Sequence, residues 1–128
     1  MKTKFVTAED GVRLAYDVSG SGPAILLLHG AGGAHTRQSW HKAGYVKRFQ
    51  GEFTVVTMDI RGHGESDQPE SAPAYAIETM CADILAVMDA VRIERFILWG
   101  FSYGGNIGRY LASKSRRVSK FVMISIPF

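Results

Sequence analysis

The segment Phe96-Ile97-Leu98-Trp99-Gly100-Phe101-Ser102-Tyr103-Gly104 decides the fold, because it joins an apolar strand to a helix through a serine flanked by glycines. Four apolar residues predict a buried strand, and residues 106–115 carry apolar positions at helical spacing. The last five residues of the segment fit G-x-S-x-G, a sharp strand-to-helix turn that exposes its serine. Gly100 and Gly104 suit such a turn, since strand and helix approach closely there. Ser102 is therefore a candidate nucleophile, and the alternative is a glycine-rich turn that only connects the two elements.

Further strands are predicted outside this segment, at residues 4–7, 12–18, 24–28, 54–58 and 121–126. The first two flank an Asp10-Gly11 turn, and we expect them to form an antiparallel hairpin at one edge of the sheet. The run at 24–28 is unbroken and apolar, which is typical of strands that are covered on both faces in parallel sheets.

Two more helices are predicted between these strands. Residues 39–50 form the first, with Ser39 as its N-cap and Gly51 as its stop. Across residues 77–91, apolar side chains recur every three or four positions, which indicates a helix with one apolar face. A hairpin followed by alternating strands and helices predicts an α/β fold, with a mostly parallel sheet and helices on both faces.

The composition is that of one ordinary soluble domain, which we expect to span residues 1–128. Hydrophobic residues make up 46% of the chain, and the formal net charge is +3. Part of the positive charge lies near the C-terminal end, at Lys114, Arg116, Arg117 and Lys120. These residues have no interleaved aromatic residues and lie in no recognised nucleic-acid module, so we expect no nucleic-acid partner.

The chain also carries signals about its compartment. Cys81 is the only cysteine, which excludes an internal disulfide and fits a reducing compartment, so we expect a cytoplasmic location. The residues before Asp10 lack the apolar core of a signal peptide. The longest apolar run, at 24–28, is far too short to span a bilayer, and we expect no membrane partner.

Three separated motifs carry a resemblance to a known family. They are His29-Gly30-Ala31-Gly32-Gly33, Asp59-Ile60-Arg61-Gly62-His63-Gly64-Glu65-Ser66 and Gly100-Phe101-Ser102-Tyr103-Gly104, each following a predicted strand. With these motifs the chain resembles the α/β-hydrolase superfamily, specifically its compact esterase, haloperoxidase-like and C–C-bond hydrolase branch. Essentially the whole chain aligns with the N-terminal portion of that family in order and spacing.

The resemblance implies roles for individual residues. Ser102 would be the nucleophile, and the backbone N–H groups of Ala31 and Tyr103 would form an oxyanion hole. Four glycines would support the two turns, namely Gly30, Gly32, Gly100 and Gly104. The helix that follows Ser102 would favour an oxyanion through its partial positive charge. The resemblance implies no metal and no organic cofactor.

The histidines allow other interpretations. His29 could be the general base for Ser102, but in the resembled family this position mainly organises the loop, and we favour that role. His63 lies in a loop that looks like a family signature for turn formation and helix packing. His35 and His41 flank Trp40, yet two histidines without a clustered acid or thiolate are weak evidence for a metal, and we interpret them as surface or pocket-rim residues.

The sequence departs from the family after the serine. The mechanism needs an acid and then a histidine downstream of Ser102, and residues 103–128 contain no Asp, Glu or His. We therefore expect the chain to be a C-terminally truncated, N-terminal part of the fold. The strand at 121–126 would then be an exposed apolar edge, able to pair with the missing C-terminal half or with a second copy.

The leading hypothesis is a serine hydrolase that acts on a small carboxylic ester or related carbonyl substrate through an acyl-enzyme at Ser102. Its catalytic partners would come from the C-terminal half or from a partner chain. One alternative is a catalytically incomplete fragment or oligomerising folding module. Another is a cofactor-free haloperoxidase-like or C–C-bond hydrolase, which the same motifs do not separate from an esterase.

Overall fold

A computed structural model describes residues 2–125 of the chain, and its centre is a mixed sheet. Six strands make up that sheet, in the order β1-β2-β4-β3-β5-β6. Their bounds are Lys4–Thr7 for β1, Arg13–Gly20 for β2, Ala24–Leu28 for β3, Thr54–Met58 for β4, Phe96–Phe101 for β5 and Val118–Ile124 for β6. β1 and β2 pair antiparallel at one edge, and β4, β3, β5 and β6 run parallel to one another. The predicted fold class and edge hairpin are therefore confirmed.

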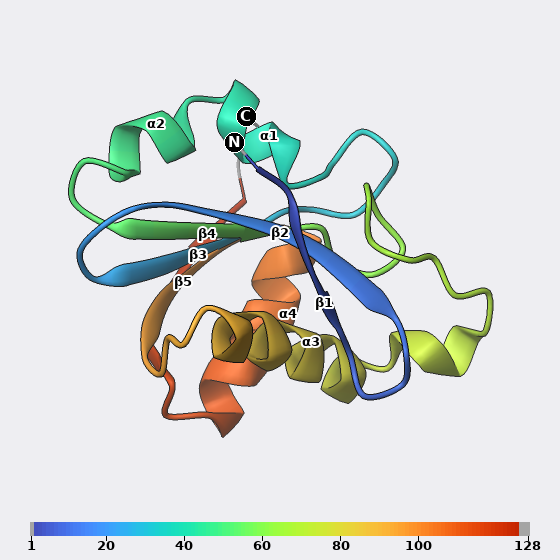
Figure 1. Ribbon diagram of the computed structural model, residues 1–128. Coiled ribbons are helices and arrows are strands. Elements are labelled where there is room, and N and C mark those ends of the chain that lie inside the picture. The colour runs from blue at the N-terminus through green and yellow to red at the C-terminus, as the bar shows by residue number, and fades with distance from the viewer. Residues whose placement is uncertain (1, 126–128) are drawn as a thin grey trace.

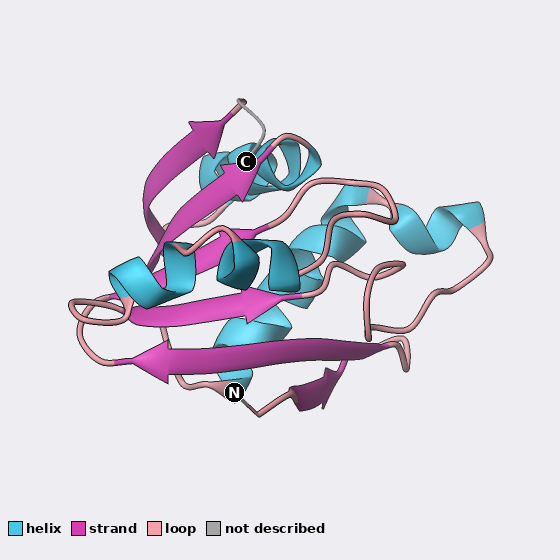
Figure 2. Ribbon diagram, turned by 90° about the horizontal axis from the view of Figure 1, so that it is seen from above, coloured by secondary structure: helices cyan, strands magenta, loops and turns pink. Residues whose placement is uncertain are grey.

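Helices cover both faces of the sheet, as Figure 1 shows. α1 (Gln38–Lys42) and α2 (Tyr45–Phe49) lie on one face, and Figure 2 shows them from above, lying over the strands. α3 (Ile77–Ala90) and α4 (Tyr103–Lys114) pack on the other face, and a 3-10 turn, η1 (Ala72–Tyr75), precedes α3. This three-layer arrangement is what alternating strands and helices predict.

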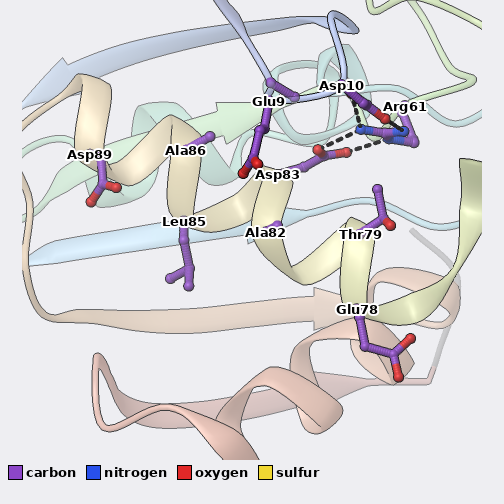
Figure 3. A pocket seen from close by; sticks show the side chains of 11 residues that line it. Glu9, Asp10, Arg61, Glu78, Thr79, Ala82, Asp83, Leu85, Ala86 and Asp89 are labelled. Carbon is purple, nitrogen blue, oxygen red and sulfur yellow. Dashed lines mark hydrogen bonds and ion pairs between the residues drawn. The ribbon is translucent and has the colours of Figure 1, made fainter.

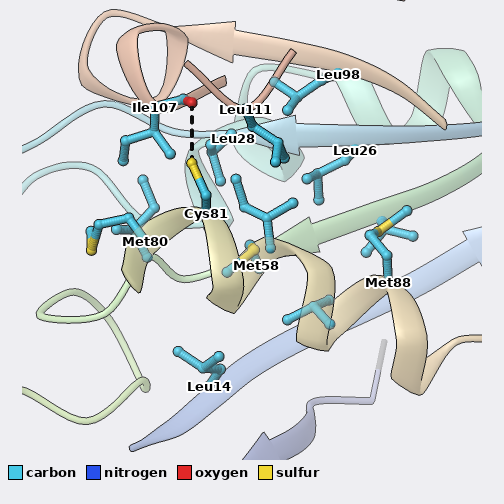
Figure 4. Close-up of a cluster of buried hydrophobic side chains, with 14 of the residues drawn as sticks. Leu14, Leu26, Leu28, Met58, Met80, Cys81, Met88, Leu98, Ile107 and Leu111 are labelled. Carbon is cyan, nitrogen blue, oxygen red and sulfur yellow. Dashed lines mark hydrogen bonds between the residues drawn. The ribbon is translucent and has the colours of Figure 1, made fainter. Parts of the chain in front are cut away.

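Each face of the sheet has its own apolar core. The larger core lies between the sheet and the helices α3 and α4, and Figure 4 shows many of its side chains, among them Leu26, Met88 and Ile107. Cys81 belongs to this core, and burial raises the pKa of its thiol to about 11. The smaller core, under α1 and α2, is built around Trp40. Since β3 and β4 are buried on both faces, their unbroken apolar runs are explained.

The prediction of one helix over residues 39–50 is wrong. The structure has two short helices there, separated at Gly44, whose φ of 85° is a left-handed conformation that glycine adopts without steric cost. Ser39 lies within α1 instead of capping it, and its hydroxyl accepts a hydrogen bond from the N–H of Thr36 at 3.2 Å. The left-handed residue interrupts the helical backbone, so α1 and α2 are separate helices on the same face of the sheet.

Other boundaries differ by a few residues. α4 begins at Tyr103 and not at Asn106, because Gly104 and Gly105 are helical and not part of the turn. β6 begins at Val118, earlier than predicted, and the predicted end at Ile126 lies outside the described residues. Two consecutive glycines usually indicate a turn in a sequence. Here Gly104 and Gly105 have no side chains, so the helix can start directly at the end of the strand.

The start of α4 lies against the end of β3 with no room for a side chain. A Cβ atom on Gly104 would overlap the carbonyl oxygens of both Leu28 and His29. On Gly100 it would lie 2.7 Å from the Cα of Gly105. Glycine at these positions is therefore what allows strand β3, strand β5 and helix α4 to meet.

Replacing Gly104 with Ala should lower the free energy of unfolding by about 3 kcal/mol, since overpacked sites cost about this much. Alanine is the better helix former by about 1 kcal/mol, so any net loss reports the clash. Urea unfolding followed by circular dichroism measures the effect. Gly33→Ala is the matched control, because nothing lies within 4 Å of a Cβ built there. Equal midpoints for the two variants would contradict the proposed contact.

Candidate active site

Ser102 occupies the turn between β5 and α4 in an unusual backbone conformation. Its φ is 51° and its ψ is −109°, and among the described residues Arg92 is the other non-glycine residue with positive φ. Such conformations cost about 1–3 kcal/mol and persist where the surroundings enforce them. Here the N–H of Ser102 donates to the carbonyl of Ile124 at 3.2 Å, and its own carbonyl accepts from Asn106 at 2.9 Å. The result is a serine that is exposed although its neighbours Phe101 and Gly104 are buried.

The loop after β3 lies next to this serine turn. β3 and β5 are adjacent parallel strands, with Leu28 paired to Gly100, so both strands end at the same edge of the sheet. Gly30 packs on the ring of Phe101, and a Cβ there would lie 2.9 Å from a ring carbon. Residues 31–34 of the loop are exposed. The structure thus brings Ala31, Tyr103 and Ser102 to the carboxyl ends of two adjacent parallel strands.

His29 is fully buried beneath this loop. Its Nδ1 lies 2.7 Å from the carbonyl of Gly30, and its Nε2 accepts a hydrogen bond from the N–H of Ile60 at 3.0 Å. A carbonyl can only accept, so Nδ1 carries the proton and the ring is neutral. Burial lowers the pKa of His29 to about 4. With both nitrogens occupied, His29 has no site to take a proton from Ser102, which supports its role in organising the loop.

His63 makes the reverse connection. Its Nε2 accepts from the N–H of Gly32 at 3.2 Å, and its Nδ1 lies 3.2 Å from the carbonyl of Arg61. The rings of His63 and His29 are in edge contact, with centroids 5.0 Å apart. His63 therefore also uses both of its ring nitrogens in loop contacts.

The remaining histidines lie over the α1 side of the sheet. The Nε2 of His41 is 3.1 Å from a carboxylate oxygen of Asp17. His35 packs against the ring of Phe101, and its Nδ1 is buried without a hydrogen-bond partner. The two imidazoles thus have different neighbours, and within residues 2–125 no group of three or more potential ligands is arranged to hold a metal.

Sequence reasoning missed Arg37, which is 1% exposed and ties the loop before α1 to the rest of the site. Its guanidinium forms ion pairs with Asp17, Asp59 and Glu65, and its backbone N–H donates to Asp59 at 2.7 Å. Burial alone would lower the pKa of Arg37, but the three carboxylates raise it above its ordinary value. The sequence gives little signal for this cluster, because Asp17 occupies a polar position of an alternating strand.

Arg61 is the second buried arginine, and it anchors the loop after β4 to α3. It binds Asp83 at 2.6 Å and Asp10 at 2.8 Å, as the dashed lines in Figure 3 indicate. Its hydrogen bond to Asp83 raises the pKa of the guanidinium above its ordinary value. The same arginine is part of the lining of a groove of about 630 Å³ between the β1–β2 turn and α3. No residue of the 29–33 or 100–104 motifs lines that groove, so it is separate from the serine site.

The family of this chain follows from its similarity to known proteins. A sequence model described as the alpha/beta hydrolase fold matches residues 23–128. The chain belongs to the alpha/beta hydrolase fold family. All three of the sequence motifs lie within the matched residues. The predicted resemblance is thereby confirmed.

Individual relatives match nearly all of this chain, whereas the chain matches only part of each of them. It is 38% identical over 119 residues to an uncharacterized protein of Mycobacterium tuberculosis, covering 90% of this chain and 32% of that protein. It is 31% identical over 122 residues to epoxide hydrolase 4 of Mus musculus, covering 93% and 33%. The crystal structure of epoxide hydrolase VrEH1 from Vigna radiata superposes with a TM-score of 0.86 at 26% identity, covering 99% and 40%. The chain therefore spans about a third of the length of these curated relatives.

The helices of the chain can also be compared with those that span membranes. Among the helices in the described part of the chain, none combines the length and apolar character needed to cross a bilayer.

The depressed pKa of His29 predicts a specific loss of stability in acid. The unfolded imidazole binds a proton near pH 6.5 and the folded one only near pH 4, so the unfolded state binds more protons between these values. Stability is thus fully present above about pH 6.5 and falls as the pH drops towards 4, by up to about 3 kcal/mol. His29→Gln removes this component, because an amide does not titrate. Urea unfolding of both proteins across this range tests it, and parallel curves would refute the assignment.

Proposed function

We propose that the chain carries the nucleophile and oxyanion hole of a serine hydrolase that acts on a small carboxylic ester or a related carbonyl substrate. The observation that carries the proposal is the exposed Ser102 with φ of 51° at the N-terminus of α4. Membership of the alpha/beta hydrolase fold family supports hydrolysis as the reaction class. Fold alone does not fix the chemistry, so the proposal rests on the serine turn and the loop beside it.

The proposed reaction proceeds through an acyl-enzyme. The hydroxyl oxygen of Ser102 bonds to the substrate carbonyl carbon while its proton passes to a histidine base, and the carbonyl oxygen takes up negative charge. The N–H groups of Ala31 and Tyr103 donate to that oxygen, and Tyr103 is suited to this because the first N–H groups of a helix have no acceptor within it. The ester C–O bond then breaks, the leaving alcohol takes the proton from the histidine, and water releases the acid in a second, equivalent round.

Epoxide opening is a second candidate, because several relatives are named epoxide hydrolases. Attack by a serine hydroxyl on an epoxide carbon would form an ether, which offers no carbonyl carbon for water to attack. An ester formed at Ser102 offers such a carbon, and its hydrolysis regenerates the serine. The identity of the nucleophile therefore favours an ester or related carbonyl substrate for this chain.

Three of the four histidines are bound in other contacts, and the fourth, His35, packs against Phe101 with its Nδ1 unpartnered among the described residues, so it is the one histidine of this chain left to test as the base. His29 and His63 use both ring nitrogens in loop contacts, and His41 is bound to Asp17. Residues 103–128 contain no histidine and no acid. We propose that the C-terminal half of the fold supplies both groups, by extending the sheet at β6, whose outer edge has no strand beside it among the described residues.

Labelling by a fluorophosphonate tests the nucleophile. Ser102→Ala should abolish covalent modification, which intact mass detects directly, whereas Ser113→Ala, an exposed serine on the same helix, should leave it unchanged. Without a base the unmutated chain should label slowly, because general-base catalysis contributes about 10²–10⁴-fold. His35→Gln is a further control, and loss of labelling in it would assign the base to this chain. Modification that persists in Ser102→Ala would remove Ser102 from the mechanism.

The β6 edge predicts self-association of the isolated chain. Met123 on β6 is 45% exposed. Phe5 on β1, at the opposite edge of the sheet, is 42% exposed and is therefore the control position for the same substitution. Met123→Lys should shift the chain from dimer towards monomer in light scattering at high concentration, because a charge on an edge strand disfavours pairing. Phe5→Lys should not. A monodisperse monomer, or the reverse response of the two variants, would count against pairing at β6.

A further inference from the structure

Two histidines bind the two loops of the site to each other in a reciprocal arrangement, which we call the histidine clasp. His29, from the loop after β3, accepts the N–H of Ile60 in the loop after β4. His63, from the loop after β4, accepts the N–H of Gly32 in the loop after β3. The two rings touch at a centroid distance of 5.0 Å. Each loop thus holds a backbone N–H of the other through an imidazole.

The clasp requires a particular protonation state of His63. Its Nδ1 faces the carbonyl of Arg61 at 3.2 Å, and a carbonyl can only accept, so Nδ1 carries the hydrogen. Nε2 is then the lone pair that receives the N–H of Gly32. In an imidazolium both nitrogens are donors, so the Nε2–H and the Gly32 N–H would face each other with no acceptor between them. Protonation therefore breaks this half of the clasp.

The middle of the loop that carries Ala31 is held less firmly than its two ends, where Gly30 packs on Phe101 and Arg37 binds Asp59. Residues 31–34 are exposed, and nothing lies within 4 Å of a Cβ built on Gly32 or Gly33. The carbonyl of Gly32 does accept the N–H of His35 at 3.0 Å, but that bond lies within the loop itself. Segments with few packed side chains open at low cost, so hydrogen bonds to the rest of the fold decide their order. The bond from Gly32 to His63 is such a bond.

The two histidines of the clasp have different surroundings. The rings that face His63 are His29 from the end of β3 and Tyr103 from α4, 5.0 and 6.3 Å away, and the charged Glu65 of its own loop is paired with Arg37. Burial keeps His29 neutral down to about pH 4, so its half of the clasp persists in mild acid. Arg61 is bound by Asp83 and Asp10 and does not compete for Nε2. His63 is half-buried and within reach of water.

We propose that His63 is a positioning residue that fixes the Ala31-Gly32 backbone only in its neutral form, so that acid releases the oxyanion loop. The consequence for catalysis rests on the proposed function, whereas the release itself does not. Ala31 precedes Gly32 directly, so loss of the Gly32 anchor frees the N–H of Ala31 from its position beside Ser102. His63 does not touch the reacting atoms in this role, and it acts through the loop.

Amide exchange and NMR titration of the 128-residue chain test this without any substrate. The exchange rate of the Gly32 N–H, corrected for its intrinsic pH dependence, should rise at least about tenfold on acidification, with the same midpoint as the imidazole signals of His63. His63→Gln places an amide oxygen where Nε2 was, so Gly32 should stay protected at every pH. His63→Leu removes the acceptor, and protection should be lost at every pH. His41→Gln, outside the clasp, should behave as the unmutated chain does.

Several outcomes would overturn the proposal. Gly32 protection that ignores the titration of His63, or that survives in His63→Leu, would show that this bond does not hold the loop. If His63→Leu does not fold, the unmutated titration and the flat profile expected of His63→Gln still decide the matter. Where labelling of Ser102 is measurable, its rate should fall in acid, and His63→Gln should remove the part of that fall that shares the midpoint of the Gly32 response. A Gly32 response without any labelling at Ser102 would leave the clasp standing and reject the proposed hydrolase instead.

Discussion

The structure depends on the contact of helix α4 with the ends of β3 and β5, where backbone meets backbone. Gly104 lies against the carbonyls of Leu28 and His29, and Gly100 lies against Gly105. No side chain fits in these gaps, so the helix begins directly at the strand end and Ser102 is left in a left-handed conformation above the sheet. Because the strain is imposed by close packing on both sides, it does not relax by a local shift of the turn. The position of Ser102 is thus a consequence of glycines that themselves do no chemistry.

The loops around the serine are held differently, through buried polar groups. Arg37 and Arg61 are both almost fully buried, and each joins segments that are distant in sequence: Arg37 meets Asp17 and Asp59, and Arg61 meets Asp83. Buried ion pairs add little net stability over apolar packing, but losing one partner leaves an unpaired charge and costs about 3–5 kcal/mol. Their effect is therefore to exclude other arrangements of the loops. Packing positions the serine, and charge pairing positions the loops that face it.

The sequence predicted those features that depend on neighbours along the chain. Apolar runs located the strands, and the glycines around Ser102 located the turn, because both signals are local. Asp17 could not be interpreted this way, since it occupies a polar position in an alternating strand, and the residues that cover it, Arg37 and His41, come from a distant part of the chain. The break at Gly44 had a visible signal, a glycine inside a helical pattern, that apolar spacing outweighed. The histidine clasp depends on β3 and β4 being adjacent and on the proton position of each ring, and neither follows from residue spacing.

These contacts separate two parts of the proposed chemistry. The donors for an oxyanion, at Ala31 and Tyr103, are backbone groups whose positions follow from β3, β5, α4 and the clasp, all within the described residues. The proton acceptor is a side chain, and in the proposed chemistry it is neither His29 nor His63, since both accept backbone N–H groups. In serine hydrolases that lose a member of the triad, the oxyanion hole and substrate binding still give about 10³–10⁴-fold acceleration over water. Electrostatic preorganisation and proton transfer are thus separate contributions, and a histidine used to fix an oxyanion loop is not free to accept a proton from the serine.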